Sequence, residues 1–246
     1  MNSSCESTLT DTTDSHDRPV ALLVMAYTAV YLIYLWLFVE LENEGMHWIT
    51  LVLIPALLLW LTNRSVHGKF SFGDLMRSVG FNRRHLKRGI LWGMACGIPL
   101  AVVQTQLSRK GDEIWEVIMS GDVFIRLPMA FVLMLITAGF TEEFFFRGVL
   151  QTTLVRRIGN RWLAIGISAV LFGFYHLPYA YLNENWSTHG DFWGAMQEGV
   201  LMASVMGIIL GIIYDRSKNL IAPIVCHSLF NAVFAMTMWN LSLKFG

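Results

Sequence analysis

The sequence predicts an all-α, polytopic membrane protein with about seven to eight transmembrane helices around a polar intramembrane cavity. It is 54% hydrophobic and only 15% charged, with a mean hydropathy of +0.50, whereas a soluble domain is about a quarter charged. Apolar runs approaching the length of a bilayer crossing recur throughout, and they lack the alternation of barrel strands. The net charge of zero gives no case for a nucleic-acid partner. Membrane lipids are therefore the expected surroundings.

Seven apolar stretches are candidates for transmembrane helices. They cover residues 20–39, 47–61, 89–107, 127–154, 162–175, 195–214 and 220–241. Residues 1–18 are polar and predict a disordered cytoplasmic tail, and residues 19–246 form a single transmembrane domain with a motif-bearing core of about 127–241. The fourth stretch is long for one crossing, which predicts tilt or a bend near Gly139. An eighth span, from a split stretch or an interfacial segment, is the alternative count.

The positive charges indicate the orientation. Residues 63–88 alternate Lys and Arg with large apolar side chains, which is typical of a cytoplasmic interfacial segment. A docking surface for anionic lipid or a substrate tail is the alternative interpretation of this segment. Most other Lys and Arg fall on the same side, so the N-terminus is predicted to be cytoplasmic. No cleavable signal peptide and no disulfide framework are indicated.

Three ionisable residues interrupt the fourth apolar stretch, within Thr141-Glu142-Glu143-Phe144-Phe145-Phe146-Arg147-Gly148. Burying such charges is unfavourable in lipid and in protein. On a regular helix Glu143 and Arg147 would be i and i+4, the favourable order for an ion pair. Glu142 would face about 100° away and meet other partners. The simplest alternative is a structural ion pair between packed helices.

Further polar residues interrupt two later stretches. His176 follows Phe172 at i+4 in the fifth, and Asn231 follows His227 at i+4 in the last. Counted from the predicted cytoplasmic boundary, Glu142 and these three polar residues lie at roughly 13 to 23 Å. Each alone is compatible with helix packing. Together they predict one polar layer within the membrane.

Such a set of residues can support hydrolysis. A carboxylate in an apolar site becomes a useful general base, so Glu142 with His176 could hold and deprotonate a water molecule. His227 and Asn231 could donate hydrogen bonds to an oxyanion. No cofactor is required by this chemistry. The alternative is a divalent metal such as Zn²⁺ that activates the water, although the HExxH spacing of common zinc proteases is lacking.

The motifs Glu142-Glu143-x-x-x-Arg147, Phe172-x-x-x-His176 and His227-x-x-x-Asn231, in this order, resemble those of the CPBP family (CAAX protease and bacteriocin-processing, or Abi). This family includes the Ras-converting CAAX endopeptidases. The resemblance covers about 90 residues, with no departure at the motif positions.

The resemblance implies about eight transmembrane helices and a cavity open to the cytosol and bilayer. It implies Glu142 as general base, His176 as an aid in positioning water, and His227 with Asn231 as oxyanion donors. Glu143, Arg147 and Phe172 would support the site. The substrate would be a protein or peptide, prenylated at a C-terminal Cys in the CAAX members, or a bacteriocin or pheromone precursor in some prokaryotic ones.

Two alternatives remain beside a glutamate-type intramembrane endopeptidase. One is a metal-dependent form of the same protease. The other is a non-catalytic membrane immunity or scaffold protein, in which the polar residues bind a peptide or join helices. A transporter is disfavoured, because no inverted repeat relates the halves and the buried polar residues cluster in the second.

Overall fold

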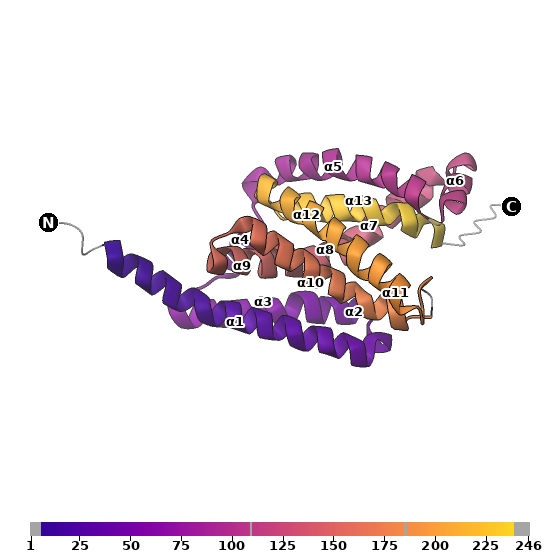
Figure 1. Ribbon diagram of the computed structural model, residues 1–246. Coiled ribbons are helices and arrows are strands. Elements are labelled where there is room, and N and C mark those ends of the chain that lie inside the picture. Colours follow the sequence, from indigo (N-terminus) through magenta and orange to yellow (C-terminus); the bar gives the residue numbers. More distant parts are fainter. Residues whose placement is uncertain (1–5, 109, 185, 239–246) are drawn as a thin grey trace. The chain divides into compact units, whose positions relative to one another are not determined.

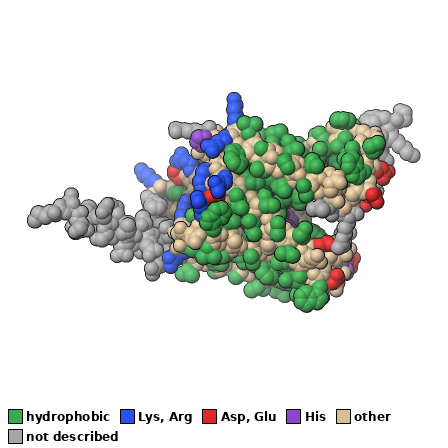
Figure 2. Space-filling model, turned by 45° about the horizontal axis from the view of Figure 1, so that its top comes forward, with side chains coloured by type: hydrophobic (Ala, Val, Ile, Leu, Met, Phe, Trp, Pro, Cys, Tyr) green, Lys and Arg blue, Asp and Glu red, His purple; other side chains and the backbone are tan. Residues whose placement is uncertain are grey.

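A computed structural model describes residues 6–108, 110–184 and 186–238, and these residues are almost entirely helical (Figure 1). Seven of the described helical stretches are long and apolar enough to cross a membrane, and they overlap the seven predicted ones. Hydrophobic side chains cover much of the visible face (Figure 2), as expected of helices that face lipid. The chain is therefore a multi-pass helical membrane protein. The span boundaries are 19–41, 44–65, 86–106, 123–158, 161–182, 192–217 and 221–238.

The chain folds into two compact units, each built from two separate segments. The first unit combines residues 1–81 with 144–212, and the second combines residues 82–143 with 213–246. Neither unit is a contiguous stretch of sequence, so each depends on helices that are far apart along the chain.

The first unit is centred on α10, which contacts α1, α9, η4 and η5. Helix α1 begins at Glu6, so it continues through residues for which the sequence predicts a disordered tail. Extending an established helix is far easier than starting one. Residues 1–5 lie outside the described part of the chain. The elements of this unit are α1 (Glu6–Phe38), η1 (Val39–Leu41), α2 (Glu44–His47), η2 (Trp48–Leu53), α3 (Ile54–His67), α4 (Phe72–Ser78), η4 (Phe144–Gln151), α9 (Thr152–Ile158), α10 (Arg161–Leu182), α11 (Phe192–Ala195), η5 (Met196–Met202) and most of α12 (Ala203–Ser217).

A tight turn joins α9 to α10. Gly159 ends α9 in the left-handed conformation at φ 72°, which glycine adopts readily. The side chain of Asn160 then caps α10 by accepting from the backbone N–H groups of Trp162 and Leu163. Helix α10 runs on to Leu182 with Pro178 inside it, so the predicted end of this span at residue 175 is too early.

The short helix α4 lies within the predicted interfacial segment. Its Leu75 is buried, whereas its Phe72 is 70% exposed. Ser71 and Asp74 form a reciprocal capping box at its start. The hydrogen bonds that Asp74 accepts from the Ser71 side chain and backbone, followed by its contact with Arg77, lower the pKa of Asp74 to about 2.

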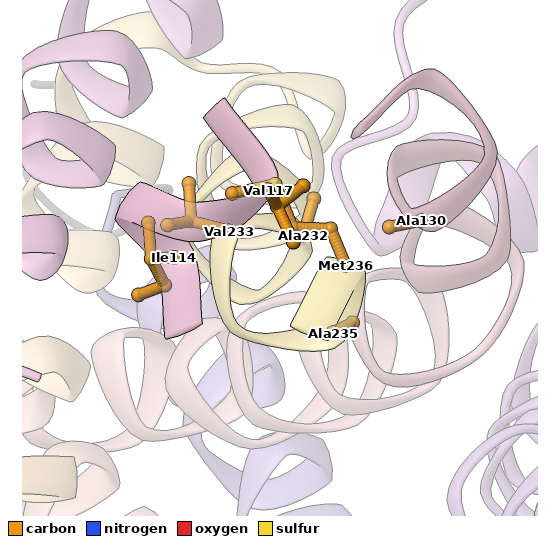
Figure 3. Close-up of a cluster of buried hydrophobic side chains, with 7 residues drawn as sticks. All are labelled: Ile114, Val117, Ala130, Ala232, Val233, Ala235 and Met236. Atoms are coloured by element: carbon orange, nitrogen blue, oxygen red, sulfur yellow. The ribbon is translucent and has the colours of Figure 1, made fainter. Parts of the chain in front are cut away.

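The second unit is organised around α13, which lies beside α5 and α7 (Figure 1). Gly93 and Gly97 of α5 permit the close approach, because a Cβ atom on Gly93 would lie 2.6 Å from the Cβ of Val225. The last turns of α13 are held in a buried apolar cluster with α6 and α7 (Figure 3). The elements are η3 (Arg83–His85), α5 (Leu86–Leu107), α6 (Gly111–Met119), α7 (Val123–Ile136), α8 (Ala138–Glu143), the end of α12 and α13 (Ile221–Met238).

The long fourth stretch is broken twice, at its middle and directly after the glutamate pair. Helix α7 ends at Ile136, and Thr137, at φ −90° and ψ −113°, separates it from α8. This interruption lies two residues before Gly139, where a bend is predicted. From Phe144 to Gln151 the backbone is π-helical, a form with i to i+5 hydrogen bonds that is frequent at functional sites.

Candidate active site

Helices α8 and α13 of the second unit bring Glu143 and His227 into direct contact. Nδ1 of His227 lies 2.8 Å from Oε1 of Glu143, and the exposed fractions of the two residues are 4% and 0%. A carboxylate can only accept at this distance, so Nδ1 carries the hydrogen. The contact therefore fixes both the orientation and the tautomer of the imidazole.

On the opposite edge of the same imidazole, Nε2 lies near Asn231 and Glu142. Nε2 of His227 lies 3.1 Å from Nδ2 of Asn231, one turn later on α13. Oε2 of Glu142 lies 4.0 Å from the same Nε2, which is longer than a hydrogen bond. The structure thus brings three of the four predicted catalytic residues together, with Glu142 and Asn231 beside the imidazole of His227. Glu142 is 6% exposed.

A glycine allows α8 to approach α13 this closely. A Cβ atom on Gly139 would lie 2.1 Å from Oγ of Ser228 and 2.8 Å from the carbonyl oxygen of Met134. The Ser228 hydroxyl donates a hydrogen bond to the carbonyl oxygen of Ile224 on its own helix, at 2.7 Å. Gly139 lies three and four residues before the two glutamates, so its contact with α13 sets their distance from His227.

The second predicted histidine lies in the first unit, on α10. Nδ1 of His176 lies 2.9 Å from the carbonyl oxygen of Phe172. A carbonyl only accepts, so Nδ1 carries the hydrogen and the lone pair of a neutral imidazole is on Nε2. The Phe172 ring contacts the imidazole edge to face, with 4.6 Å between centroids. The predicted i, i+4 packing of these residues is confirmed.

Arg147 supports this pair from the π-helical segment. Its guanidinium carbon lies 4.5 Å from the centroid of Phe172, within the range of a cation–π interaction. Its Nη2 donates to the carbonyl oxygen of Gly207 at 3.3 Å. The residue is 1% exposed. Arg147, Phe172 and His176 therefore form one stack in the first unit.

The ion pair between Glu143 and Arg147 stays a prediction. It was expected from i, i+4 spacing on a regular α-helix, but the segment from Phe144 onward is π-helical. The two residues belong to different units. The common depth in the membrane expected of His176 and Glu142 also stays a prediction, because these two residues likewise belong to different units.

The described residues do not form a recognisable metal site. No group of three or more His, Cys, Asp or Glu side chains among them has a geometry able to hold a metal ion. Both nitrogens of the His227 ring are within hydrogen-bond distance of protein groups, Glu143 and Asn231.

Comparison with known proteins finds one similar family. Residues 124–233 match the model of a family described as type II CAAX prenyl endopeptidase Rce1-like. This part of the chain is therefore similar to that family. The matched segment runs from α7 into α13 and holds all seven predicted site residues, so the CAAX-protease resemblance expected from the three motifs is confirmed. No curated protein and no solved structure matches the chain.

Two contacts in this part of the chain were not predicted from the sequence. Ser228 meets Gly139, for which only a bend was expected, where α8 approaches α13. The carbonyl oxygen of Gly207 accepts a hydrogen bond from Arg147. The Gly207-x-x-x-Gly211 spacing on α12 is a signal that could have found the last of these. Small residues four apart are typical of close helix approach in membranes, and Gly207 lies against the backbone of Ala169 on α10.

Proposed function

We propose that the protein is an intramembrane endopeptidase that hydrolyses a peptide bond with a water molecule activated by Glu142. The observation that carries this proposal is the arrangement of Glu142, His227 and Asn231. A carboxylate lies 4.0 Å from an imidazole nitrogen, and an amide lies 3.1 Å from the same nitrogen. The match of residues 124–233 to CAAX prenyl endopeptidases supports the same reaction class.

In the first step Glu142 takes a proton from water, and the water oxygen attacks the carbonyl carbon of the scissile bond. The electron pair of that carbonyl moves to its oxygen. Nδ2 of Asn231, and Nε2 of His227 when it is protonated, donate to this oxyanion. We assign His176 the task of positioning the water, which is the role that the resemblance of its motif implies. Its Nε2 lone pair suits that task, because the Nδ1 hydrogen is engaged by the Phe172 carbonyl.

In the second step the tetrahedral intermediate collapses and the carbon–nitrogen bond breaks. Glu142 passes its proton to the leaving amine, so the carboxylate is regenerated and one water molecule is consumed per bond. Glu143 stays in contact with Nδ1 of His227 throughout. This contact keeps the ring oriented with Nε2 toward Asn231 and Glu142.

We infer that the substrate is a protein or peptide carrying a prenylated C-terminal CAAX sequence, the class named by the family. The test is cleavage of a quenched prenylated CAAX peptide in detergent and in liposomes. The Glu142→Gln variant should lose about 10²- to 10⁴-fold in kcat, the usual contribution of a general base. Glu116→Gln, at an exposed carboxylate of α6, is the matched control and should cleave as wild type does.

The remaining outcomes separate the alternatives. Activity that a strict chelator abolishes and Zn²⁺ restores would favour a metal-dependent protease. Full activity of Glu142→Gln would overturn the proposed role of this residue. Absence of cleavage by wild type, with prenylated and unprenylated peptides alike, would favour the non-catalytic alternative.

A further inference from the structure

A glutamate outside the proposed active site is buried without an evident purpose. Glu42 follows α1 and η1 and lies between the first two spans. Its side chain is 0% exposed, and neither carboxylate oxygen makes a hydrogen bond of ordinary geometry with any residue that the structure describes. A buried carboxylate without donors is strongly disfavoured in its charged form.

The groups around Glu42 come from three elements of the first unit. Nε2 of His47, on α2, lies 3.5 Å from Oε2 of Glu42. The same Nε2 lies 3.0 Å from the hydroxyl of Tyr179 on α10. The titratable groups that face Glu42 or this contact are Tyr27, Tyr31 and Tyr34 of α1, His47 of α2 and Tyr179 of α10, with Glu40 and Glu44 beside it in the chain.

The proton affinity of Glu42 places its titration near neutral pH. Burial raises the pKa of Glu42 to about 7, and the neighbouring Tyr34 hydroxyl offsets only part of this effect. At acidic pH the carboxyl therefore keeps its proton and is neutral. Above about pH 7 that proton is lost, and an unpaired negative charge remains in a buried position.

The contact with Tyr179 connects this glutamate to the helix that carries His176. Tyr179 is three residues after His176, which places the two on neighbouring turns of one face of α10. Tyr175, next to His176, packs against Tyr179 with 5.4 Å between ring centroids and against Tyr31 with 6.1 Å. The segment from Tyr175 to Tyr179 thus contacts α1 through the rings of Tyr31 and Tyr175, and it contacts α2 through both the hydroxyl and the ring of Tyr179.

We propose that Glu42, His47 and Tyr179 are positioning residues: while Glu42 is protonated and neutral, Nε2 of His47 stays with the Tyr179 hydroxyl and holds the His176 segment of α10 against α1 and α2. Loss of the Glu42 proton leaves a carboxylate 3.5 Å from the same Nε2, and this carboxylate competes with the Tyr179 oxygen for the Nε2 hydrogen. The contact between His47 and Tyr179 is then weakened, and the segment is released. The consequence for catalysis rests on the proposed function of His176, whereas the consequence for helix mobility does not.

Hydrogen–deuterium exchange of the whole protein in detergent tests the structural part. The measured quantity is the protection factor of residues 175–182, corrected for intrinsic exchange, at about pH 6 and about pH 8.5. Glu40→Gln, which replaces an exposed carboxylate two residues away, is the control. In wild type and in this control, the protection factor should fall about threefold or more at the higher pH. In Glu42→Gln, which mimics the protonated acid, protection should be equal at both pH values.

Tyr179→Phe tests the path and does not depend on the folding of the Glu42 variant. It keeps the ring that packs on Tyr175 but removes the hydroxyl that His47 contacts, so protection should be low at both pH values. A wild-type segment equally protected at both pH values would overturn the proposal. So would a Glu42→Gln or Tyr179→Phe segment that responds to pH as wild type does.

The pH dependence of peptide cleavage tests the link to catalysis. Glu42→Gln should retain kcat at pH values where wild type and Glu40→Gln have begun to lose it. An unchanged pH profile, together with the expected exchange result, would overturn the positioning role for His176. If neither wild type nor any variant cleaves at any pH, the proposed function fails. The exchange experiment still decides whether protonation of Glu42 holds α10 in place.

Discussion

The contact between Glu143 and His227 gives adjacent carboxylates different roles. Glu143 lies 2.8 Å from Nδ1 and is fully buried, whereas Glu142 lies 4.0 Å from Nε2. A carboxylate on Nδ1 holds the imidazole in place and stabilises its protonated form. Glu142, beyond hydrogen-bond distance from that ring, is placed to accept a proton from another donor. The pair therefore divides into an orienting residue and a proposed base.

We predict that Glu143→Gln lowers kcat about 10- to 100-fold with little change in KM. The Gln carbonyl can still accept the Nδ1 hydrogen, but it does not stabilise the imidazolium that donates to the oxyanion. Steady-state kinetics of the two enzymes measure this. An unchanged kcat in Glu143→Gln would contradict an electrostatic role.

The stack of Arg147, Phe172 and His176 makes a second prediction at a single residue. Phe172→Leu keeps an apolar side chain but removes the π-face below the guanidinium and the ring beside the imidazole. The free energy of unfolding should fall by about 1–3 kcal/mol, measured by denaturant titration in micelles. Phe174→Leu, on an exposed ring of the same helix, is the control. Equal stability of the two variants would contradict the stack.

At the scale of helices, the sequence identified the spans well but not their breaks. Hydropathy depends on composition, so seven spans were found at the predicted places. The interruption at Thr137 lies close to the expected bend. The π-helical segment from Phe144 could not be anticipated, because hydropathy does not distinguish i to i+4 from i to i+5 hydrogen bonding. The predicted pairing of Glu143 with Arg147 was derived on the assumption of a regular helix.

The buried state of Glu42 was missed for a different reason. In sequence it belongs to the acidic turn Glu40–Gly45, which is typical of a solvated loop. Its burial depends on His47 and on Tyr179, and the contact between those two joins positions 132 residues apart. The positions of Glu142, His227 and Asn231 were easier to anticipate, because polar residues in apolar spans are conspicuous.

The approach of α8 to α13 gives a prediction at the scale of helices. Gly139→Ala should lower cleavage at least tenfold, because the new methyl would lie 2.1 Å from Oγ of Ser228 and push the glutamates away from His227. Gly166→Ala, where a Cβ meets nothing within 4 Å, should cleave as wild type does. Adding Ser228→Ala to Gly139→Ala should restore part of the activity. No rescue, with folding intact, would place the cause elsewhere.

At the scale of the whole molecule, each unit contributes one set of motif residues. The second holds Glu142, Glu143, His227 and Asn231, and the first holds Arg147, Phe172 and His176. The chain passes from one unit to the other directly after Glu143. The backbone changes from α-helical to π-helical at the same place. The two sets of motif residues are therefore joined along the chain directly after the glutamate pair.

From the seven spans and from the Lys and Arg bias we predict a cytoplasmic N-terminus, with the residues that follow the last span on the opposite side of the membrane. This orientation predicts which loops a membrane-impermeant maleimide reaches in intact cells. With Cys5, Cys96 and Cys226 replaced by Ser, Glu113→Cys should react in intact cells. Lys218→Cys, at a side chain 71% exposed, should react only after permeabilisation. The reverse pattern would invert the orientation, and labelling of both in intact cells would contradict an odd number of spans between the two sites.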